Sequence, residues 1–285
     1  MINDSIFTVH NYHIEVDKLN EPIYLIPFGD VHRFAPLCDV EKWHEFLAWA
    51  KIKPNSYFLG MGDYDDLAST SERKALMQAC LHESTQMTID ELFISRTNKL
   101  CEELSFMKGK LIGMIEGNHY GMLQSGISTT QMMCEKLKTK YLGVSSFIRL
   151  SFIHNKNRRA SIDVWAHHGR GASRLFGGSL NSVEQMSSIS NAQVLLMGHD
   201  HKKSVALKTS LYLTNGGKEV KLKQRKILLG RTGSFLRGYV DNAPSYIAEL
   251  ALPPTDLGVL KIELTPKRSC KNGDDTFYID IHCSI

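Results

Sequence analysis

Short apolar runs, each bounded by glycine, aspartate or histidine, alternate along the chain with amphipathic stretches. Runs this short and rich in β-forming residues are typical of strands buried on both faces. Five runs have this character: residues 23–28, 57–61, 110–115, 162–166 and 193–197. Helical periodicity lies between them, as in residues 40–51, where Asp39 is the candidate N-cap. Strand followed by helix, repeated, predicts an α/β layered fold.

The remaining segments predict further helices and strands. After His201 the pattern changes to β, with the TNGG sequence at 214–217 as a turn signal. We expect two helices within 71–107, single helices in 128–140 and 181–190, and strands at 257–264, 276–283 and, as an edge, 12–16. No internal repeat or linker interrupts the pattern, so residues 1–285 are expected to form one domain. Its motif-bearing core spans 23–205, and 206–285 is a β-rich C-terminal part.

The composition is ordinary for a soluble globular protein, with 42% hydrophobic and 22% charged residues. No stretch approaches the roughly 20 consecutive apolar residues of a membrane span. The first residues lack the basic and apolar regions of a signal peptide. The six cysteines lie far apart without a Cys-x-x-Cys motif, which favours reduced thiols. We therefore expect a cytoplasmic protein with no membrane partner.

Basic residues concentrate in one stretch, 202–231, which holds nine of them and a single acid, Glu219. The positive electrostatic potential of such a stretch attracts an anionic substrate or a nucleic-acid backbone. A solvated, lysine-rich hairpin explains the same composition. Because the stretch follows directly on the last histidine motif, its position favours a polyanion such as DNA or RNA. A homodimer could also form through the β-rich part, although nothing in the sequence requires one.

Polar residues with metal-binding chemistry follow each apolar run, in the motifs GDVH, GDYDD, GNHY, HHG and GHDH. Because the carboxyl ends of parallel strands line one crevice, we expect these side chains to meet there. The side chains of residues two apart at a strand end, such as Asp30 and His32, point the same way and can bind the same ion. The motifs supply Asp30, His32, Asp63, Asn118, His119, either His167 or His168, His199 and His201.

This donor set indicates two metal ions. Imidazole with carboxylate and amide oxygen suits Mn, Fe, Zn or Ni better than Ca or Mg. The donors outnumber the ligands that one ion takes, and Asp63 is the candidate carboxylate for bridging two ions. Any one of these motifs arises by chance in many proteins, and a lone histidine is more often a core or surface residue than a ligand. Five motifs in order, each at the end of an apolar run, are hard to explain by chance.

The order D-x-H, G-D-x-x-D, G-N-H, H, G-H-x-H resembles that of the calcineurin-like metallophosphoesterases, a superfamily of dinuclear-metal phosphatases, phosphodiesterases and nucleases. The resemblance spans residues 29–201. It implies an αββα sandwich of two mixed β-sheets flanked by helices. It also implies two divalent ions, with Mn²⁺ as first choice and Fe, Zn or Ni as alternatives. One ion would be held by Asp30, His32 and His201, the other by Asn118, His199 and one of His167 and His168, with Asp63 between them.

Two positions depart from the family pattern or leave it open. Tyr120 stands where the family usually has an acid, so the carboxylate that would orient His119 is missing or comes from elsewhere. In the HHG motif, His168 directly precedes the glycine, whereas counting from the strand end favours His167 equally well. Asp65 and Asp66 are expected to be supporting or turn residues, with Asp66 at the second aspartate position of the family motif.

The resemblance implies hydrolysis of a phosphate ester by a hydroxide that bridges the two metals. His119, beside a ligand, is expected to protonate the departing oxygen. Arg33 could hold a phosphate oxygen through its guanidinium group, or form a surface ion pair. Arg170 and Arg174 belong to a glycine-rich loop, 169–178, that could contact phosphate or serve only as a connector.

Several function classes share these motifs. Phosphodiester hydrolysis, with nucleic acid as a candidate substrate, is the first expectation. Phosphomonoester hydrolysis, including that of phosphoproteins, is the alternative. A catalytically silent metal-binding scaffold and a metal-sensing or storage protein are further alternatives. The complete ligand set and the retained His119 favour catalysis, and Tyr120 is the feature that favours a scaffold.

Overall fold

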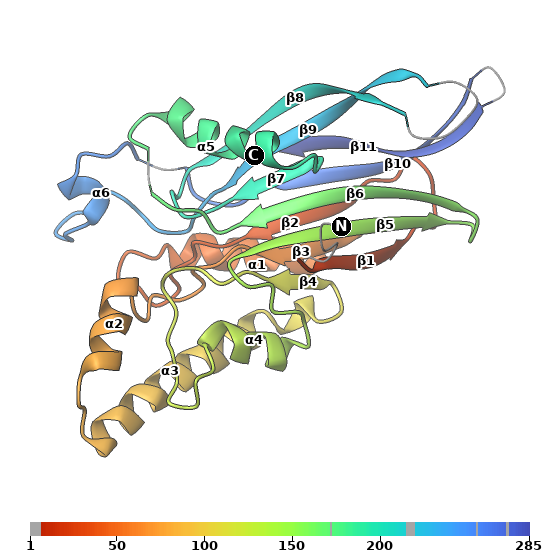
Figure 1. Cartoon of the computed structure of the whole chain (residues 1–285). Coiled ribbons are helices and arrows are strands. Elements are labelled where there is room, and N and C mark those ends of the chain that lie inside the picture. Colours follow the sequence, from red (N-terminus) through yellow and green to blue (C-terminus); the bar gives the residue numbers. More distant parts are fainter. Residues whose placement is uncertain (1–6, 172, 215–219, 255, 272–273) are drawn as a thin grey trace, which may run out of the picture.

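Two mixed β-sheets form the centre of the protein in the computed structural model (Figure 1), which describes residues 7–171, 173–214, 220–254, 256–271 and 274–285. The six-stranded sheet has the order β1 (Val9–Glu15), β5 (Ser145–His154), β6 (Arg158–His167), β7 (Val194–Met197), β9 (Leu222–Thr232), β8 (Lys203–Leu213). The five-stranded sheet has the order β11 (Asp274–Ser284), β10 (Lys261–Lys271), β2 (Ile23–Phe28), β3 (Ser56–Gly60), β4 (Leu111–Met114).

Three clusters of buried apolar side chains set the order of the layers. The largest cluster contains side chains of both sheets, such as Leu25 on β2 and Val194 on β7, so the sheets pack face to face. A second cluster joins the five-stranded sheet to its helices, and a third joins Leu195 on β7 to Val183. The helices are α1 (Val40–Ile52), α2 (Thr70–Gln78), α3 (Glu83–Glu103), the 3₁₀ turn η1 (Ser105–Met107), α4 (Thr129–Leu137), α5 (Phe176–Ile189) and α6 (Tyr246–Glu249).

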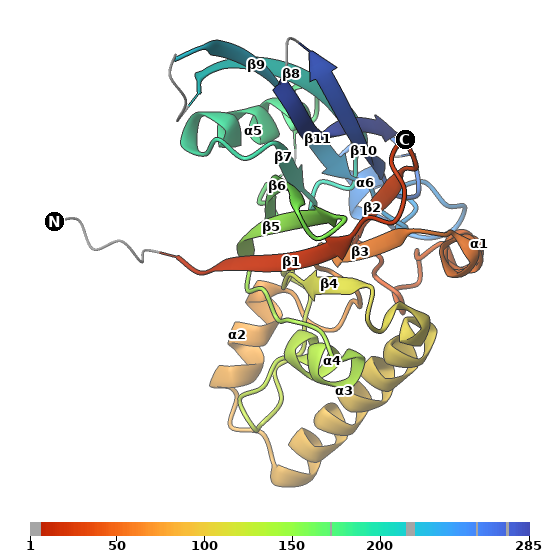
Figure 2. The same ribbon diagram turned by 90° about the vertical axis from the view of Figure 1, so that its right-hand side faces the viewer.

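Helices therefore cover both outer faces of the paired sheets. Figure 2 shows α5 on the side of the six-stranded sheet and α3 and α4 on the side of β4, with α1 at the edge of the view. The predicted α/β class is confirmed, with two mixed sheets and flanking helices as the layers. No helix in the described ranges has the length and hydropathy needed to cross a membrane.

All five apolar runs form strands, and the strands belong to two sheets. β2, β3 and β4 are parallel neighbours in one sheet, and β6 and β7 are parallel neighbours in the other. The five strand ends thus meet where two sheets face each other, instead of lining one sheet.

Most of the predicted elements form close to their expected bounds. Asp39 caps α1 by accepting a hydrogen bond from the Lys42 amide at 2.9 Å. The region 71–107 holds two helices, α2 and α3, as expected. Residues 9–15 form an edge strand, β1, paired in parallel with β5.

Two predicted elements have different bounds in the structure, and one strand was not predicted. The helix expected at 181–190 begins earlier, at Phe176, because Gly177 and Gly178 enter its first turn instead of a loop. The strand β5 was not expected, although its alternating burial matches a strand with one face in the core. The strand expected at 257–264 begins at Lys261 and continues to Lys271. Of the TNGG turn, residues 215–217 lie outside the described residues.

Candidate metal centre

Asp30, His32 and His201 form the first group of possible ligands, with their ligand atoms within 4.8 Å of one another. Asp30 and His32 follow β2, and His201 follows β7 in the other sheet. The Nε2 atoms of His32 and His201 lie 3.3 Å apart, and His201 Nε2 lies 3.8 Å from Asp30 Oδ1. Two nitrogens bound to one ion at about 2.0–2.1 Å in tetrahedral geometry would be separated by about 3.3 Å. The two imidazoles are therefore spaced as ligands of a single ion.

Asp30 shows that this group fits a cation. Its side chain is fully buried, and Oδ2 accepts a hydrogen bond from the His199 amide at 2.9 Å. Oδ1 has no hydrogen-bond partner among the described residues, which is costly for a buried carboxylate. Burial raises the pKa of Asp30 to about 7 and lowers the pKa of His201 well below its usual range. A neutral imidazole beside an unpartnered carboxylate oxygen is a suitable donor set for a divalent ion.

Asp63, His168 and His199 form the second group, and Asn118 joins them. Asn118 Oδ1 lies 2.9 Å from His168 Nε2 and 2.8 Å from His199 Nδ1. His168 Nε2 also lies 3.2 Å from Asp63 Oδ2. Four side chains from the ends of β3, β4, β6 and β7 thus converge on one point with oxygen and nitrogen donors.

Asp63 lies between the two groups. Its Oδ1 accepts hydrogen bonds from the amides of Asn118 and His119, at 2.7 and 2.8 Å. Its Oδ2 lies 3.2 Å from His168 Nε2 and 3.9 Å from His32 Nε2, so this oxygen faces both groups. Although burial by itself would raise it, the pKa of Asp63 is held low by His168 and His32. This is the geometry expected of a bridging carboxylate.

His168, and not His167, belongs to the cluster. His168 Nδ1 is 2.8 Å from the Met61 carbonyl, and a proton donated there leaves Nε2 as the ligand atom. Burial by itself would lower the pKa of His168, but Asp63 and Asp30 raise it to about 9. His167 ends β6, and its Nδ1 accepts a hydrogen bond from the Gly169 amide at 2.7 Å. Of the two histidines between which the sequence did not choose, His168 is the one in a group of possible metal ligands. The ligand cluster is Asp30, His32, Asp63, Asn118, His168, His199 and His201.

Much of the backbone of the ligand cluster has a positive φ, a conformation that residues other than glycine rarely adopt. Non-glycine residues with positive φ are uncommon, and they concentrate at functional sites. Five members of the cluster have φ between 47° and 74°: Asp30, His32, Asp63, His199 and His201. Glycines allow the close packing around them. A Cβ on Gly117 would lie 2.0 Å from Asp63 Oδ1, and one on Gly62, where φ is 97°, would lie 2.5 Å from His168 Nδ1.

His119 lies beside the cluster and is oriented by Asp66. Its Nδ1 is 2.6 Å from Asp66 Oδ1, and the same oxygen is 3.5 Å from His32 Nδ1. The hydrogen bond from His119 is the main reason that the pKa of Asp66 is lowered. Tyr120 therefore does not leave His119 unsupported, because the orienting carboxylate comes from the G-D-x-x-D motif. Asp66 is the second aspartate of that motif.

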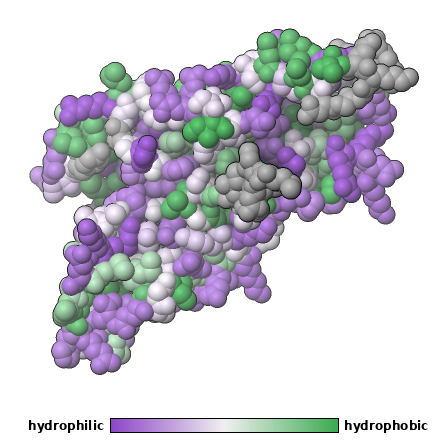
Figure 3. Space-filling model, in the orientation of Figure 1, coloured by the Kyte–Doolittle hydropathy of each residue, from purple (hydrophilic) through white to green (hydrophobic). Residues whose placement is uncertain are grey.

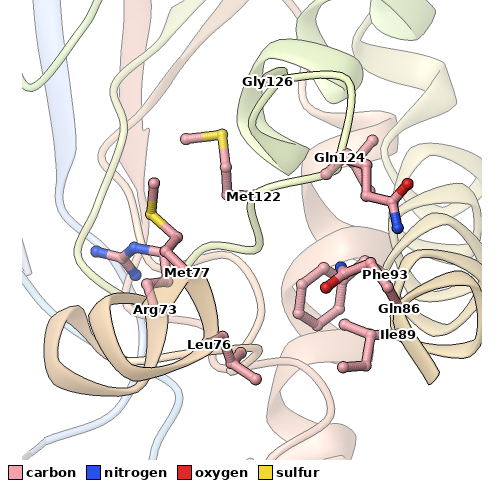
Figure 4. Close-up of a pocket in the computed structure, with 10 residues that line it drawn as sticks. Arg73, Leu76, Met77, Gln86, Ile89, Phe93, Met122, Gln124 and Gly126 are labelled. Atoms are coloured by element: carbon pink, nitrogen blue, oxygen red, sulfur yellow. The ribbon is translucent and has the colours of Figure 1, made fainter. Parts of the chain in front are cut away.

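Arg73 supports the same loop and was not found from the sequence. Its guanidinium donates to the carbonyls of Asn118 and Tyr120, at 2.7 and 3.2 Å, and stacks on the Tyr120 ring at 3.7 Å. These contacts hold the backbone on both sides of His119. Arg73 also lines a separate cavity of about 290 Å³ between α2, α3 and the loop at 122–126, shown in Figure 4. An isolated arginine on a predicted helix gives no signal of such a role.

The arginines expected to bind substrate lie outside the cluster. Arg33 forms a two-pronged ion pair with Glu103, at 2.8–3.1 Å, which is the alternative considered for it. Arg170 and Arg174 are exposed to solvent, on either side of Gly171 and Ser173. It is Gly171 and Ser173 that line the cavity at the cluster.

The basic stretch 202–231 begins at the cluster and then leads away from it. The strands β8 and β9 form a hairpin whose far end joins Leu213 to Leu222. An eleven-residue strand at about 3.3 Å per residue spans roughly 35 Å, so Lys221 and Lys223 lie far from the cluster. Figure 3 shows hydrophobic surface at this end of the hairpin, beside the grey atoms. Nearer the cluster, Lys203 pairs with Asp256 at 2.8 Å. The stretch does not form a cationic rim around the cluster.

Comparison of the chain with models of known protein families and with curated protein sequences found no match. The assignment of a function therefore depends on the geometry of the ligand cluster and on the motif order that led to it.

Proposed function

We propose that the protein is a metal-dependent phosphoric ester hydrolase of the calcineurin-like metallophosphoesterase type. One observation carries the proposal: five strand ends bring two groups of metal donors together, with Asp63 facing both and His119 beside them. A storage or sensing site has no need of an oriented histidine next to its ligands. His32, Asp66 and His119 form a third group with metal-binding chemistry, but the 2.6 Å contact between His119 Nδ1 and Asp66 Oδ1 is the arrangement expected of an oriented proton donor.

The donor atoms fit two divalent ions. Asp30, His32 and His201 would hold one, and Asn118, His168 and His199 the other, with Asp63 shared. Imidazole and oxygen donors without thiolate favour Mn, Fe, Zn or Ni, and Mn²⁺ is the first to test. Bound ions would polarise the phosphoryl group and activate water for attack on phosphorus.

His119 supplies the proton that hydrolysis requires. In the overall reaction, the water oxygen bonds to phosphorus, the ester P–O bond breaks, and the departing oxygen gains a proton. Asp66 accepts the hydrogen bond from His119 Nδ1 and leaves Nε2 to carry that proton. Because the pKa of Asp66 is lowered, its carboxylate stays charged and remains the hydrogen-bond acceptor for His119 Nδ1.

The motifs are shared by enzymes that act on diesters and by enzymes that act on monoesters, so both kinds of ester enter the first experiment. The protein is stripped with chelator, reloaded with Mn²⁺, and tested for nitrophenolate release from bis-(p-nitrophenyl) phosphate and p-nitrophenyl phosphate. We expect metal-dependent release, with the diester as the better substrate. His201→Ala should abolish it, whereas His13→Ala, an exposed histidine on β1, should not. A failure of Mn²⁺, Fe²⁺, Zn²⁺ and Ni²⁺ to support any release would overturn the proposal.

A further inference from the structure

The ligand cluster opens into a cavity of about 420 Å³ whose wall has two different parts. Histidines and aspartates of the cluster, together with Asp66 and His119, form one part. A second part is apolar and comes from a single stretch of chain that carries no metal-binding motif. It consists of Leu236, Ile247, Leu252 and Pro253, which we call the apolar wall.

The apolar wall is attached directly to the cluster. The Asp30 carbonyl accepts hydrogen bonds from the Phe235 amide at 3.0 Å and from Ser234 Oγ at 2.9 Å. Leu236 follows at once, so its position is set relative to Asp30. The Leu252 amide donates to the Ile247 carbonyl at 2.9 Å, which closes the segment around α6. Figure 1 shows α6 at the end of the sheets where β6 and β7 terminate.

Two cations at the cavity, Lys202 and Arg231, are engaged by the protein itself. Arg170 and Arg174 are exposed and flank the lining residues without lining the cavity themselves. Lys202 is the one lysine or arginine among the described residues that line it, and its side chain is 8% exposed. It donates to the Ser173 carbonyl and lies 3.9 Å from Asp200. Arg231, behind it, is buried and donates to the carbonyls of Ser179 and Gly198. Binding of a polynucleotide depends on lysines and arginines that neutralise successive phosphates, and the described lining of this cavity supplies only Lys202, which is already engaged.

The volume of the cavity suits one phosphate and one compact organic group. An engineered apolar cavity of about 150 Å³ holds benzene, so about 420 Å³ accommodates a ring together with a phosphoryl group at the metals. Apolar lining with a few convergent polar groups is the usual composition of a small-molecule site.

We propose that the substrate is a small phosphate ester whose apolar group, an aryl or branched alkyl group, packs against Leu236, Ile247, Leu252 and Pro253 while its phosphate lies at the ligand cluster. This inference rests on the proposed hydrolase function and narrows its substrate class. It replaces nucleic acid, which the composition of 202–231 favoured, with a substrate of limited size.

The test measures binding separately from turnover. Phenylphosphonate and methylphosphonate carry the same charged group and cannot be hydrolysed as esters, and calorimetry gives their affinities for the Mn²⁺-loaded protein. Burial of a phenyl ring predicts that phenylphosphonate binds about tenfold more tightly, or more. Leu252→Ala and, as a second variant, Leu236→Ala should reduce this preference to about threefold or less. Leu250→Ala, an exposed leucine of the same segment, is the matched control and should retain it.

Measurements of turnover then distinguish a failure of the apolar subsite from a failure of the hydrolase function on which it rests. Phenyl p-nitrophenyl phosphate and methyl p-nitrophenyl phosphate release the same nitrophenolate and differ only in the second group. A higher kcat/KM for the phenyl ester, lost in Leu252→Ala, supports the inference. Equal affinities for the two phosphonates, equal kcat/KM for the two esters, or faster hydrolysis of DNA or RNA would overturn it and leave the hydrolase function standing. A preference for phenylphosphonate without any hydrolysis would support the apolar subsite and contradict the hydrolase function.

Discussion

The ligand cluster and the apolar wall line the same cavity but are built in different ways. The cluster lies at the ends of five buried strands, and most of its side chains have a second contact that fixes their orientation, such as the Met61 carbonyl on His168. The wall belongs to an irregular stretch with one short helix, α6. The chain leading to it is attached to the cluster through the Asp30 carbonyl, which accepts from the Phe235 amide and from Ser234 Oγ.

This difference separates the chemistry from the choice of substrate. Donors held by two packed sheets cannot move without disturbing the core, so the arrangement of the donor atoms is expected to be rigid. A loop segment can exchange side chains without changing the strands below it. Changes in the cluster should therefore abolish metal binding or turnover, and changes in the wall should alter affinity for one kind of ester.

The largest effect is expected from Asp63→Asn. The amide keeps the shape of the side chain but removes the charge that both metal groups share. We expect the loss of at least one bound metal and a fall in turnover of about 10³-fold or more. Metal analysis and the nitrophenolate assay measure the two effects. Asp17→Asn, at an exposed aspartate, is the control, and full metal content in Asp63→Asn would show that Asp63 is not a shared ligand.

His119→Ala should separate catalysis from metal binding within the cluster region. Loss of a general acid lowers turnover by about 10²–10⁴-fold, and most strongly for esters with poor leaving groups. Metal content should stay unchanged, because His119 is oriented by Asp66 and is not one of the seven residues of the ligand cluster. The assay compares leaving groups of different pKa, with His282→Ala, at an exposed histidine, as the control. Loss of metal in His119→Ala would contradict this role.

Gly117→Ala tests how rigid the cluster is. The added Cβ would meet Asp63 Oδ1 at 2.0 Å and the Asp63 amide nitrogen at 2.3 Å, so Asp63 has to move. Overpacking of this kind costs about 1–3 kcal/mol of stability, and weaker metal binding should accompany it. Thermal unfolding with and without Mn²⁺ measures both. Gly177→Ala, within α5 and with open space around it, should be neutral or stabilising. Equal thermal stability and equal Mn²⁺ binding of the two variants would show that the cluster accommodates the added Cβ and is not rigid.

The smallest effect is expected from Asp39→Asn, which removes an ion pair next to the apolar wall. Arg237, next to Leu236, pairs with Asp39 at 2.7 Å, and this hydrogen bond lowers the pKa of Asp39. A lowered folded-state pKa stabilises the protein above the unfolded value of about 3.9, and the stabilisation disappears as the pH falls through the folded value. An asparagine at this position can still cap α1. For metal-free protein at pH 7, Asp39→Asn should lower the midpoint of urea unfolding by about 0.2 M.

The difference between the variant and the wild type should shrink as the pH falls through the lowered folded-state pKa of Asp39, because the carboxylate is then increasingly protonated. A difference in midpoint that does not change with pH would show that the ion pair with Arg237 contributes nothing.

Much of the cluster could be predicted because its motifs are local. Asp30 with His32, and His199 with His201, are close in sequence, and each pair follows a recognisable apolar run. The choice between His167 and His168 could not be made, because it depends on which imidazole faces the other sheet after β6 ends. The partner of Arg33 could not be found either, since Glu103 lies 70 residues away on α3.

The sequence by itself determined the α/β class, the strands that carry the donors, and the residue types available for metal chemistry. These are properties of local periodicity and of motifs a few residues long. Only the tertiary structure decided that Asp66 orients His119, that the basic hairpin leads away from the cluster, and that an apolar wall lines the same cavity as the cluster. Each of these depends on contacts between segments far apart in the chain, and the packing of two sheets, which no local pattern encodes, brings them together.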